Sequence, residues 1–309
     1  MRVAVLHHTR LPVHGYGGTE RVVVALIRGL AALGHEVVLL APPGSTVPEA
    51  RLLPVPEARL RQAGFDPTPL LPPRTDILHA FYPLRGAPAA PWVWTLEGTT
   101  PRGITRPPNT IYVSADHARR HGAGCFVHNG LDPTEFRFQA DKDDYDLFLG
   151  RLHHSKGYHW AIAAARSSRR SLVVAGGWRP TLSRYVRFVG TVDGTEKRNL
   201  LAGARLLWMP ALWDEPFGLT LIEALWSGTP VLATRRGALP EVLSPDTAEF
   251  GDTPEELTAC LPAMAKKNPA ACRSRAERYF DHRRMAAGYV RCYRSWLATG
   301  VLPDGEPAS

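Results

Sequence analysis

Short apolar runs alternate with amphipathic stretches along most of this 309-residue chain. The runs are rich in Val, Ile and Leu and show no strict polar–apolar alternation, which is typical of strands buried on both faces. They predict strands at residues 2–7, 36–41, 76–81, 92–96, 110–114 and 125–129, and a second set at 146–152, 171–176, 186–191, 204–210 and 229–234. Helical spacing lies between them, as at 19–34, where Val22, Leu26 and Leu30 share one face. The alternation of strands and helices predicts an α/β fold with parallel sheets.

The two sets of strands predict two domains. A polar segment rich in acidic residues at 132–146 separates the two sets, so we expect one domain at 1–138 and another at 139–285. The proline-rich stretches 41–74 and 86–91 are expected to be long loops, and 303–309 a frayed tail.

The amino-acid composition excludes some classes of protein. Hydrophobic residues make up 44% of the chain and charged residues 21%, which excludes a largely disordered protein. The apolar runs are far shorter than the roughly 20 residues that span a bilayer, and the first ten residues carry no long apolar stretch. We therefore expect a cytoplasmic protein without a transmembrane helix or signal peptide.

Most of the net charge of +8 lies near the end of the chain. Residues 266–294 contain nine basic and two acidic side chains, a local charge of +7, and we interpret this segment as a basic helix. The helix is either a solvated face or a surface for anionic lipid or another polyanion. Aromatic residues do not alternate with its basic ones in a stacking pattern, so nucleic acid is not an expected partner.

The four cysteines and twelve histidines give no metal signature. Cys125, Cys260, Cys272 and Cys292 form no CxxC pair, and buried free thiols are favoured over disulfide or metal roles. We expect neither a metal nor another cofactor.

The first candidate motif is His14-Gly-Tyr-Gly-Gly-Thr-Glu20, between the first strand and the first helix. Gly17 and Gly18 allow backbone to approach a ligand, and Thr19 is expected to cap the helix, whose N–H groups attract an anion. A plain tight turn is the alternative. The motif matches neither the dinucleotide pattern GxGxxG nor the phosphate-loop pattern GxxxxGK[ST].

The second motif is Gly150-Arg-Leu-His-His-Ser-Lys-Gly157, at the end of a predicted strand. Open α/β sheets bind ligands at the carboxyl ends of their strands. Arg151 and Lys156 are two cations that suit a diphosphate and would stabilise the charge on a departing nucleoside diphosphate. An ordinary surface loop is the alternative.

The third motif, Glu215-Pro-Phe-Gly-Leu-Thr-Leu-Ile-Glu223, is the most specific. Pro216 fits the first turn of a helix, which would place Glu215 at the helix entrance and Glu223 two turns further on the same face. Their separation along the axis would be on the order of 10 Å, which is too wide for a retaining glycosidase pair at about 5 Å. It suits the two ends of an extended nucleotide sugar.

These motifs together resemble the family-4 retaining glycosyltransferases of the GT-B fold. The matching pieces are Gly150-Arg-Leu with Lys156-Gly, Val189-Gly-Thr-Val, Glu215-Pro-Phe-Gly-Leu with Glu223-Ala, Ser227-Gly-Thr-Pro-Val, Gly17-Gly-Thr-Glu20, Gly34-His-Glu-Val37 and His128-Asn-Gly-Leu-Asp132. The resemblance spans most of the chain. It implies two facing Rossmann-like domains with the active site in the cleft, and a last helix at about 286–300 that returns to the N-terminal domain.

The resemblance also implies roles for individual residues. Arg151 and Lys156 would hold the donor diphosphate, and Gly17 and Gly18 would face it from the other domain. Glu223 would bind the ribose hydroxyls, and backbone near Val192 would meet the base. Glu215 would contact the donor sugar, with Phe217, Gly218, Leu219 and Thr220 completing the donor-binding set.

Two positions depart from the family's pattern. In the family a histidine usually follows the Pro-x-Val-x-Thr strand, whereas Pro91-Trp-Val-Trp-Thr-Leu-Glu97 ends in Glu97. A second histidine often follows the one that matches His79, and Phe81 occupies that position. Glu97 is expected to orient an acceptor or donor-sugar hydroxyl, or to act as a general base or nucleophile.

Three functions remain open from the sequence. The leading one is a metal-independent, retaining transfer of a hexose from a nucleotide diphosphate sugar, with UDP favoured, to a hydroxyl acceptor. The second is a sugar-nucleotide epimerase or phosphorylase on the same architecture. The third is a non-catalytic protein that binds a nucleotide sugar, or a polyanion through the basic helix.

Overall fold

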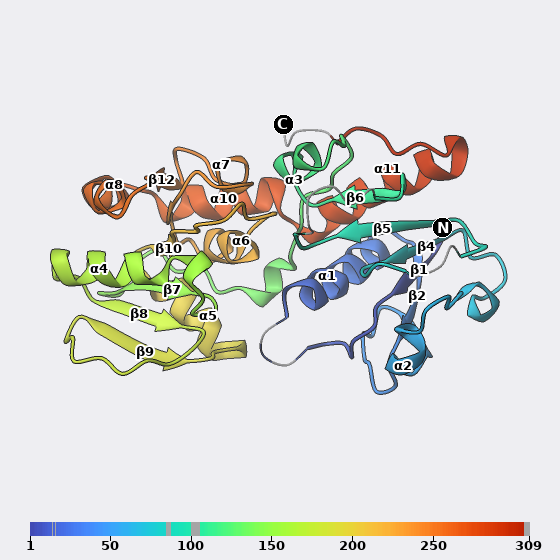
Figure 1. Cartoon of the computed structure of the whole chain (residues 1–309), viewed down its shortest axis with the longest axis horizontal. Helices are drawn as coiled ribbons and strands as arrows, with labels where there is room; N and C mark the ends of the chain where they lie inside the picture. The colour runs from blue at the N-terminus through green and yellow to red at the C-terminus, as the bar shows by residue number, and fades with distance from the viewer. Residues whose placement is uncertain (14, 16, 85–87, 100–105, 306–309) are drawn as a thin grey trace. The chain divides into compact units, whose positions relative to one another are not determined.

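The computed structural model describes residues 1–13, 15, 17–84, 88–99 and 106–305. The chain divides into two compact units (Figure 1). Unit 1 comprises Met1–Asp132 and Asp281–Ser309, and unit 2 comprises Pro133–Phe280. Each unit contains a six-stranded sheet whose paired strands are parallel. The predicted α/β class with two parallel sheets is confirmed.

The sheet of unit 1 has the order β3-β2-β1-β4-β5-β6. Its strands are β1 (Arg2–Leu6), β2 (Glu36–Ala41), β3 (Arg51–Pro54), β4 (Ile77–Ala80), β5 (Trp92–Leu96) and β6 (Thr110–Tyr112). The direction of winding reverses between β1 and β4. In open α/β sheets the crevice outside the carboxyl ends of the strands at such a reversal is where ligands bind.

The helices of unit 1 come from both ends of the chain. They are α1 (Gly18–Ala32), α2 (Glu57–Leu60), α3 (Ala115–Arg120) and α11 (His282–Thr299), with the 3₁₀ turn η1 (Thr68–Leu70). The first helix packs against the last one. A Cβ atom on Gly29 would overlap the carbonyl oxygen of His282 and lie 2.8 Å from Cβ of Ala286, so the absence of a side chain lets α1 and α11 approach closely.

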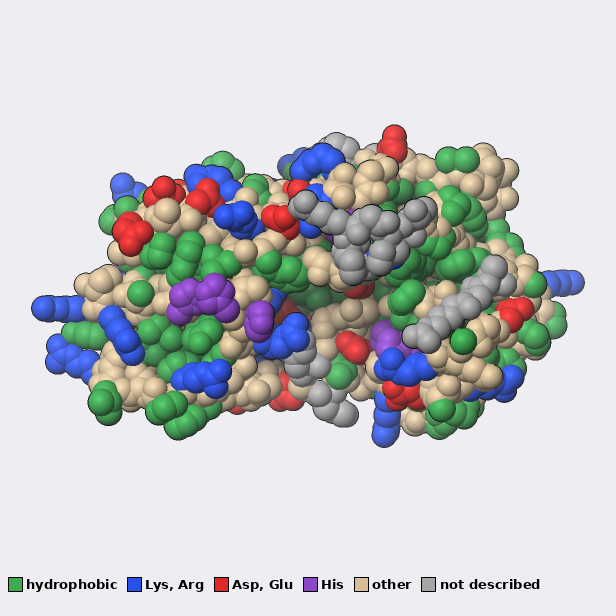
Figure 2. Space-filling view, in the orientation of Figure 1, with side chains coloured by type: hydrophobic (Ala, Val, Ile, Leu, Met, Phe, Trp, Pro, Cys, Tyr) green, Lys and Arg blue, Asp and Glu red, His purple; other side chains and the backbone are tan. Residues whose placement is uncertain are grey.

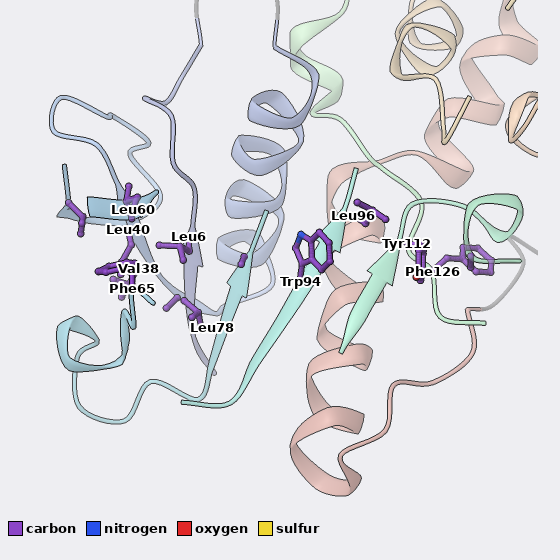
Figure 3. Close-up of a cluster of buried hydrophobic side chains, with 14 residues drawn as sticks. Leu6, Val38, Leu40, Leu60, Phe65, Leu78, Trp94, Leu96, Tyr112 and Phe126 are labelled. Carbon is purple, nitrogen blue, oxygen red and sulfur yellow. The ribbon is translucent and has the colours of Figure 1, made fainter. Parts of the chain in front are cut away.

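One core layer of unit 1 is built from side chains that alternate along the strands (Figure 3). Residues two positions apart share a face of a strand, as Val38 and Leu40 do on β2 and Trp94 and Leu96 on β5. Phe65, which follows α2, packs into the same cluster. The neighbouring residues on these strands are buried as well, which explains why the sequence shows apolar runs rather than alternation.

Unit 2 repeats this topology with the order β12-β11-β10-β7-β8-β9. Its strands are β7 (Asp146–Leu149), β8 (Leu172–Ala175), β9 (Val186–Gly190), β10 (Leu207–Met209), β11 (Val231–Ala233) and β12 (Ala248–Phe250). The winding reverses between β7 and β10. The carboxyl ends of these two strands therefore define the expected ligand crevice of unit 2.

The helices of unit 2 flank this sheet. They are α4 (Tyr158–Ser168), α5 (Gly194–Gly203), α6 (Leu219–Trp226), α7 (Leu239–Val242), α8 (Pro254–Ala259), α9 (Leu261–Met264) and α10 (Pro269–Tyr279), with the 3₁₀ turns η2 (Pro133–Glu135) and η3 (His154–Lys156). Phe148, Trp208 and Leu232 of the central strands pack with Leu257 of α8 in one core cluster.

Two strands were not predicted and one predicted strand is absent, and all three lie at the rim of a sheet. The edge strands β3 and β12 were missed, because β3 is only partly buried and includes Pro54, while β12 has three residues. Residues 125–129 form no strand. Phe126 makes a single parallel bridge with Tyr112, so the burial expected from its apolar run is present without a ladder.

The basic segment 266–294 is not one helix. It contains α10, which ends at Tyr279, and the beginning of α11, and the two helices belong to different units. The carboxylate of Asp281 accepts a hydrogen bond from the Arg283 N–H at 2.7 Å and caps α11. An N-cap signal within a charged run therefore marks a helix start that charge alone does not show.

Candidate functional site

The loop after β7 places Arg151 and Lys156 where the winding of the unit 2 sheet reverses. Arg151 follows β7 directly after Gly150, and η3 then leads through Gly157 into α4. Gly157 has φ of 69°, in the left-handed region, and a Cβ there would overlap the carbonyl oxygen of Pro210. The loop therefore lies against the segment that follows β10, and a hydrogen bond of 2.8 Å from the Leu212 N–H to the Ser155 carbonyl fixes it there.

Lys156 and Glu215 form an ion pair at this point. Lys156 Nζ donates to Glu215 Oε2 at 2.7 Å, and the same ammonium lies 4.8 Å from the centre of the Trp213 ring. The two charged side chains are 17% and 12% exposed, so solvent screens the pair less than it would a surface pair. Lys156 and Glu215 were both predicted site residues, but their pairing and the contact with Trp213 were not predicted.

The segment between Glu215 and Glu223 differs from the prediction. Helix α6 begins at Leu219, after Gly218 with φ of 90°, and not at Pro216. The left-handed backbone at Gly218 interrupts any helix that would start earlier. Glu215 consequently lies outside α6, and the expectation that both carboxylates share one helical face, with the spacing calculated from it, is wrong.

Residues on both sides of Gly218 anchor this segment. Phe217 is buried and meets the Phe280 ring edge to face, with the ring centres 5.9 Å apart. Leu219 and Thr220 form the first turn of α6, and the Thr220 hydroxyl lies 3.9 Å from the sulfur of Met209 at the end of β10. The first turn of α6 is consequently held next to the carboxyl end of β10.

Glu223 is a buried carboxylate on α6 with a cation beside it. Its side chain is 1% exposed, and Lys197 Nζ of α5 donates to its Oε1 at 2.7 Å. Val192, which is also buried, precedes α5 at the carboxyl end of β9. Because a buried carboxylate needs a counter-charge, a basic partner for Glu223 was foreseeable, but nothing in the sequence singled out Lys197.

Gly17 and Gly18 lie at the start of α1 in unit 1. Gly17 is the N-cap residue in an extended conformation, and α1 begins at Gly18. The prediction that Thr19 caps the helix is wrong, because Thr19 lies inside the first turn and the N-cap residue is Gly17, which has no side chain. The residues His14 and Tyr16 of the same motif lie outside the described residues.

The carboxylate of Glu20 lies near the start of α1. Glu20, in the first turn of α1, accepts a hydrogen bond from the Thr9 hydroxyl at 3.2 Å, and its Oε1 lies 3.7 Å from His7 Nε2. The interaction with His7, opposed by burial, lowers the pKa of Glu20 to about 2. Glu20 is therefore ionised at neutral pH and interacts favourably with the N-terminal end of α1.

Glu97 follows β5, as predicted, and is held by Asn129. The Asn129 side-chain amide donates to Glu97 Oε2 at 2.9 Å, whereas Oε1 is buried without a hydrogen-bond partner in the described part of the chain. Burial raises the pKa of Glu97 to about 7, against the lowering effect of the Asn129 bond. This carboxyl is thus partly protonated at neutral pH.

A buried hydrogen-bond network that the sequence analysis missed lies on the strands leading to Glu97. His79 on β4 bonds through Nδ1 to the Tyr293 hydroxyl and through Nε2 to the Thr95 hydroxyl, both at 2.7 Å. The Thr95 hydroxyl also lies 3.0 Å from the Tyr289 hydroxyl. Burial lowers the pKa of His79 to about 3, so its ring is neutral. The network joins β4 and β5 to α11.

The predicted site residues are divided between the units. Gly17, Gly18 and Glu97 belong to unit 1, and the other nine, from Arg151 to Glu223, belong to unit 2. Within the described residues, no group of three or more His, Cys, Asp and Glu side chains is arranged to hold a metal ion.

Two protein-family models match this chain. The model described as Glycosyltransferase Family 4 matches residues 16–94, and the one described as Glycosyl transferases group 1 matches residues 145–266. The second match contains the β7 loop, the Lys156–Glu215 pair and Glu223. The chain belongs to the family 4 glycosyltransferases.

Relatives of this glycosyltransferase include a glycogen synthase and a mannosyltransferase. Glycogen synthase from Mycobacterium tuberculosis is 30% identical over 196 residues, which cover 54% of this chain and 47% of the relative. The matched region thus spans about half the length of that protein. Phosphatidyl-myo-inositol mannosyltransferase of the same species is 26% identical and covers 92% of this chain and 95% of its own.

Solved structures of GT-B glycosyltransferases share the fold over nearly the whole chain. AviGT4, a glycosyltransferase involved in avilamycin A biosynthesis, is 28% identical with a TM-score of 0.78 and covers 98% of this chain and 99% of its own. Anabaena HepE, in complex with UDP and glucose, is 14% identical with a TM-score of 0.68, over 96% and 100%. The GT-B assignment made from the motifs is confirmed.

Proposed function

We propose that this glycosyltransferase moves a hexose from a nucleotide diphosphate sugar, with UDP as the favoured nucleotide, to a hydroxyl acceptor, with retention of anomeric configuration and without a metal ion. One observation carries the proposal. The Lys156–Glu215 pair and Arg151 lie at the carboxyl ends of β7 and β10, where the winding of the unit 2 sheet reverses.

The geometry supports a role for Lys156 in stabilising the leaving diphosphate. An ammonium has three donor hydrogens, and the bond to Glu215 uses one of them. Lys156 can therefore keep Glu215 in place and still donate to a phosphate oxygen. Arg151, five residues earlier in the same loop, would add a second cation as negative charge develops on the departing nucleoside diphosphate.

We assign the donor sugar to Glu215 and the ribose hydroxyls to Glu223. The ion pair with Lys156 holds the Glu215 carboxylate next to the proposed diphosphate site. A group in this place would contact both the sugar and the diphosphate of the donor. Glu223, on the second turn of α6, is held by Lys197. Backbone near Val192 would contact the base, and the first turn of α6 would offer its N–H groups to the diphosphate.

Retention requires the acceptor to approach from the face on which the diphosphate leaves. Glu97 is the candidate residue of unit 1 for orienting a hydroxyl there. At neutral pH its carboxyl can donate or accept a hydrogen bond, because burial brings its pKa to about 7. Glu97→Gln retains a hydrogen-bonding group, so activity within about tenfold of wild type indicates orientation, and loss of about 100-fold or more indicates a base or nucleophile.

Calorimetric titration of UDP, GDP, ADP and dTDP, with and without EDTA, tests the donor assignment. We expect micromolar affinity for UDP that EDTA leaves unchanged. UDP is favoured because HepE, which shares the fold, was solved with it, whereas the mannosyltransferase relative shows that other sugars occur among similar chains. Tighter binding of another diphosphate would replace UDP, and dependence on a divalent cation would contradict the metal-free mechanism.

Glu223 offers a sharper test of the donor pose. If its carboxylate binds the ribose hydroxyls, wild type should bind UDP about 10- to 100-fold more tightly than 2′-deoxy-UDP, the range for hydrogen bonds to a charged group. Glu223→Gln should remove most of this difference and leave the affinity for 2′-deoxy-UDP nearly unchanged. A preference for UDP that survives the substitution would show that another residue reads the ribose.

Product analysis separates the transferase from the alternatives. A retaining transferase gives a glycoside with the anomeric configuration of the donor, which NMR of the product reports directly. An epimerase would convert the sugar nucleotide without an acceptor, and a phosphorylase would require inorganic phosphate. A non-catalytic binding protein would bind the diphosphate and show neither transfer nor slow donor hydrolysis.

A further inference from the structure

A long section of unit 2 contains basic residues and no acidic ones. From Leu147 to Val192 the sequence includes seven arginines and Lys156 but neither Asp nor Glu. Arg151 and Lys156 belong to the candidate site, and Arg170 forms a bidentate pair with Asp146. The remaining five arginines are all exposed, and they are Arg166, Arg169, Arg179, Arg184 and Arg187.

Two large apolar side chains are exposed within the same section. Trp178 is 64% exposed and Leu182 is fully exposed, and both lie in the connection between β8 and β9. Arg179 and Arg184 flank Leu182 along the chain. Figure 2 shows Lys, Arg and hydrophobic side chains projecting from the part of unit 2 where Figure 1 labels β8 and β9.

The hydrogen bonds of the sheet fix both ends of the connection between β8 and β9. Gly177 is bridged to Gly190 at the end of β9, and the Leu172 N–H donates to the Tyr185 carbonyl at the start of β8. Residues 178–184 therefore run back along β9, which is an edge strand of the sheet. Because β8 and β9 pair with Leu172 opposite Val186, Arg169 and Arg184 lie at the same end of the sheet.

We propose that residues 178–184, called the β9 surface below, dock the protein on an anionic lipid bilayer through Trp178, Arg179, Leu182 and Arg184. Trp is favoured at the boundary between lipid headgroups and hydrocarbon, and arginines attract the anionic headgroups around it. An exposed leucine gains free energy in a bilayer but nothing against a phosphate backbone. The combination therefore favours a membrane over a nucleic acid.

The basic residues on α10 are less suited to this role. Arg275 is directed inward, with its guanidinium donating to the carbonyls of Val242 and Glu241 at 2.7 and 3.1 Å. Arg273 donates to the Trp226 carbonyl at 3.1 Å and lies over the Trp226 ring. On α11, Arg283 and Arg294 are exposed, so they provide a matched control for the charge of the β9 surface.

Vesicle flotation with the full chain tests the proposal. The protein should bind vesicles of equal parts phosphatidylglycerol and phosphatidylcholine, should not bind phosphatidylcholine alone, and should be released at about 1 M salt, where charge interactions are screened within about 3 Å. Two double variants, Arg179→Gln/Arg184→Gln and Trp178→Ser/Leu182→Ser, should each lower the partition coefficient roughly tenfold or more.

The controls distinguish the surface from a general polycation. Arg283→Gln/Arg294→Gln removes the same charge from α11 and should bind vesicles like wild type, and both loop variants should keep wild-type affinity for UDP. No binding of wild type to the anionic vesicles would overturn the proposal. So would a Trp178→Ser/Leu182→Ser variant that still binds them, or an equal loss on removing charge from α11. The UDP titration is unaffected by these outcomes, so the proposed transferase activity is tested separately.

Discussion

Lys156 and Arg151 are the residues on which the proposed chemistry depends most directly. Each cation would stabilise charge that grows as the diphosphate leaves, so Lys156→Ala and Arg151→Ala should each lower turnover by about 100-fold or more. Lys266→Ala removes the same charge at an exposed position and should leave turnover unchanged. Initial rates with the donor identified by calorimetry provide the measurement, and wild-type rates in both site variants would remove the assigned roles.

Glu97 should make the stability of unit 1 depend on pH. Its pKa is raised from 4.5 to about 7 in the folded chain, so folding favours the protonated form. The contribution of Glu97 to stability is therefore fully present below pH 4.5 and is lost as the pH rises through about 7, by up to about 3 kcal/mol. Glu97→Gln carries no such penalty and should be more stable than wild type at pH 8 but similar at pH 4.5.

Urea denaturation at the two pH values measures this difference. Glu255→Gln is the matched control, because Glu255 is exposed at the start of α8. Its effect on the free energy of unfolding should be small at both pH values. If Glu97→Gln behaves in the same way, the carboxyl is ionised in the folded chain and cannot donate the hydrogen bond proposed for it.

At the scale of elements, the turn between η3 and α4 determines where the cations lie. Gly157→Ala would combine a left-handed backbone with overlap against Pro210, and should destabilise unit 2 by about 2 kcal/mol or more. Gly150→Ala is the matched control, because a Cβ there meets only the Phe148 ring at 3.7 Å, an ordinary contact. Thermal unfolding of both variants checks the prediction, and equal melting temperatures would contradict it.

Central strands could be predicted from the sequence more readily than edge strands. Central strands such as β1 and β8 are buried on both faces and leave continuous apolar runs, so their positions were predictable. Edge strands leave a weaker pattern, and β12 has only three residues, one of them Glu249. The sequence predicts the start of α6 three residues too early, because Pro216 is a helix-start signal, whereas the left-handed backbone of Gly218 leaves no such signal.

Candidate residues were easier to identify than their partners. Short motifs identify the candidate residues, because the chemistry of each motif is visible within a few consecutive positions. These residues are Arg151, Lys156, Glu215 and Glu223. Lys197 is 26 residues from Glu223 and pairs with it only through the packing of α5 against α6. The network from His79 to Tyr293 joins residues 214 positions apart. Local sequence patterns contain no information about such distances along the chain.

At the scale of the whole molecule, the two units differ in whether they are continuous along the chain. Unit 2 is one continuous segment, Pro133–Phe280, and contains nine of the twelve candidate residues. Expressed alone, it should fold and bind UDP within about tenfold of the full chain, or about 1.4 kcal/mol, because only three of the twelve candidate residues belong to unit 1. Circular dichroism and calorimetry provide the measurement. A larger loss would assign a substantial part of donor binding to unit 1.

Unit 1 is discontinuous, because α11 completes it from the far end of the chain. During synthesis its sheet and α1 leave the ribosome before unit 2, but the helix that covers Gly29 and binds His79 leaves only after unit 2. Unit 2 is complete before then. N-terminal domains generally fold first during translation, but unit 1 cannot be completed until unit 2 has been synthesised. The apolar face that receives α11 consequently waits through the synthesis of the whole second unit, and the nascent chain is most in need of a chaperone over that interval.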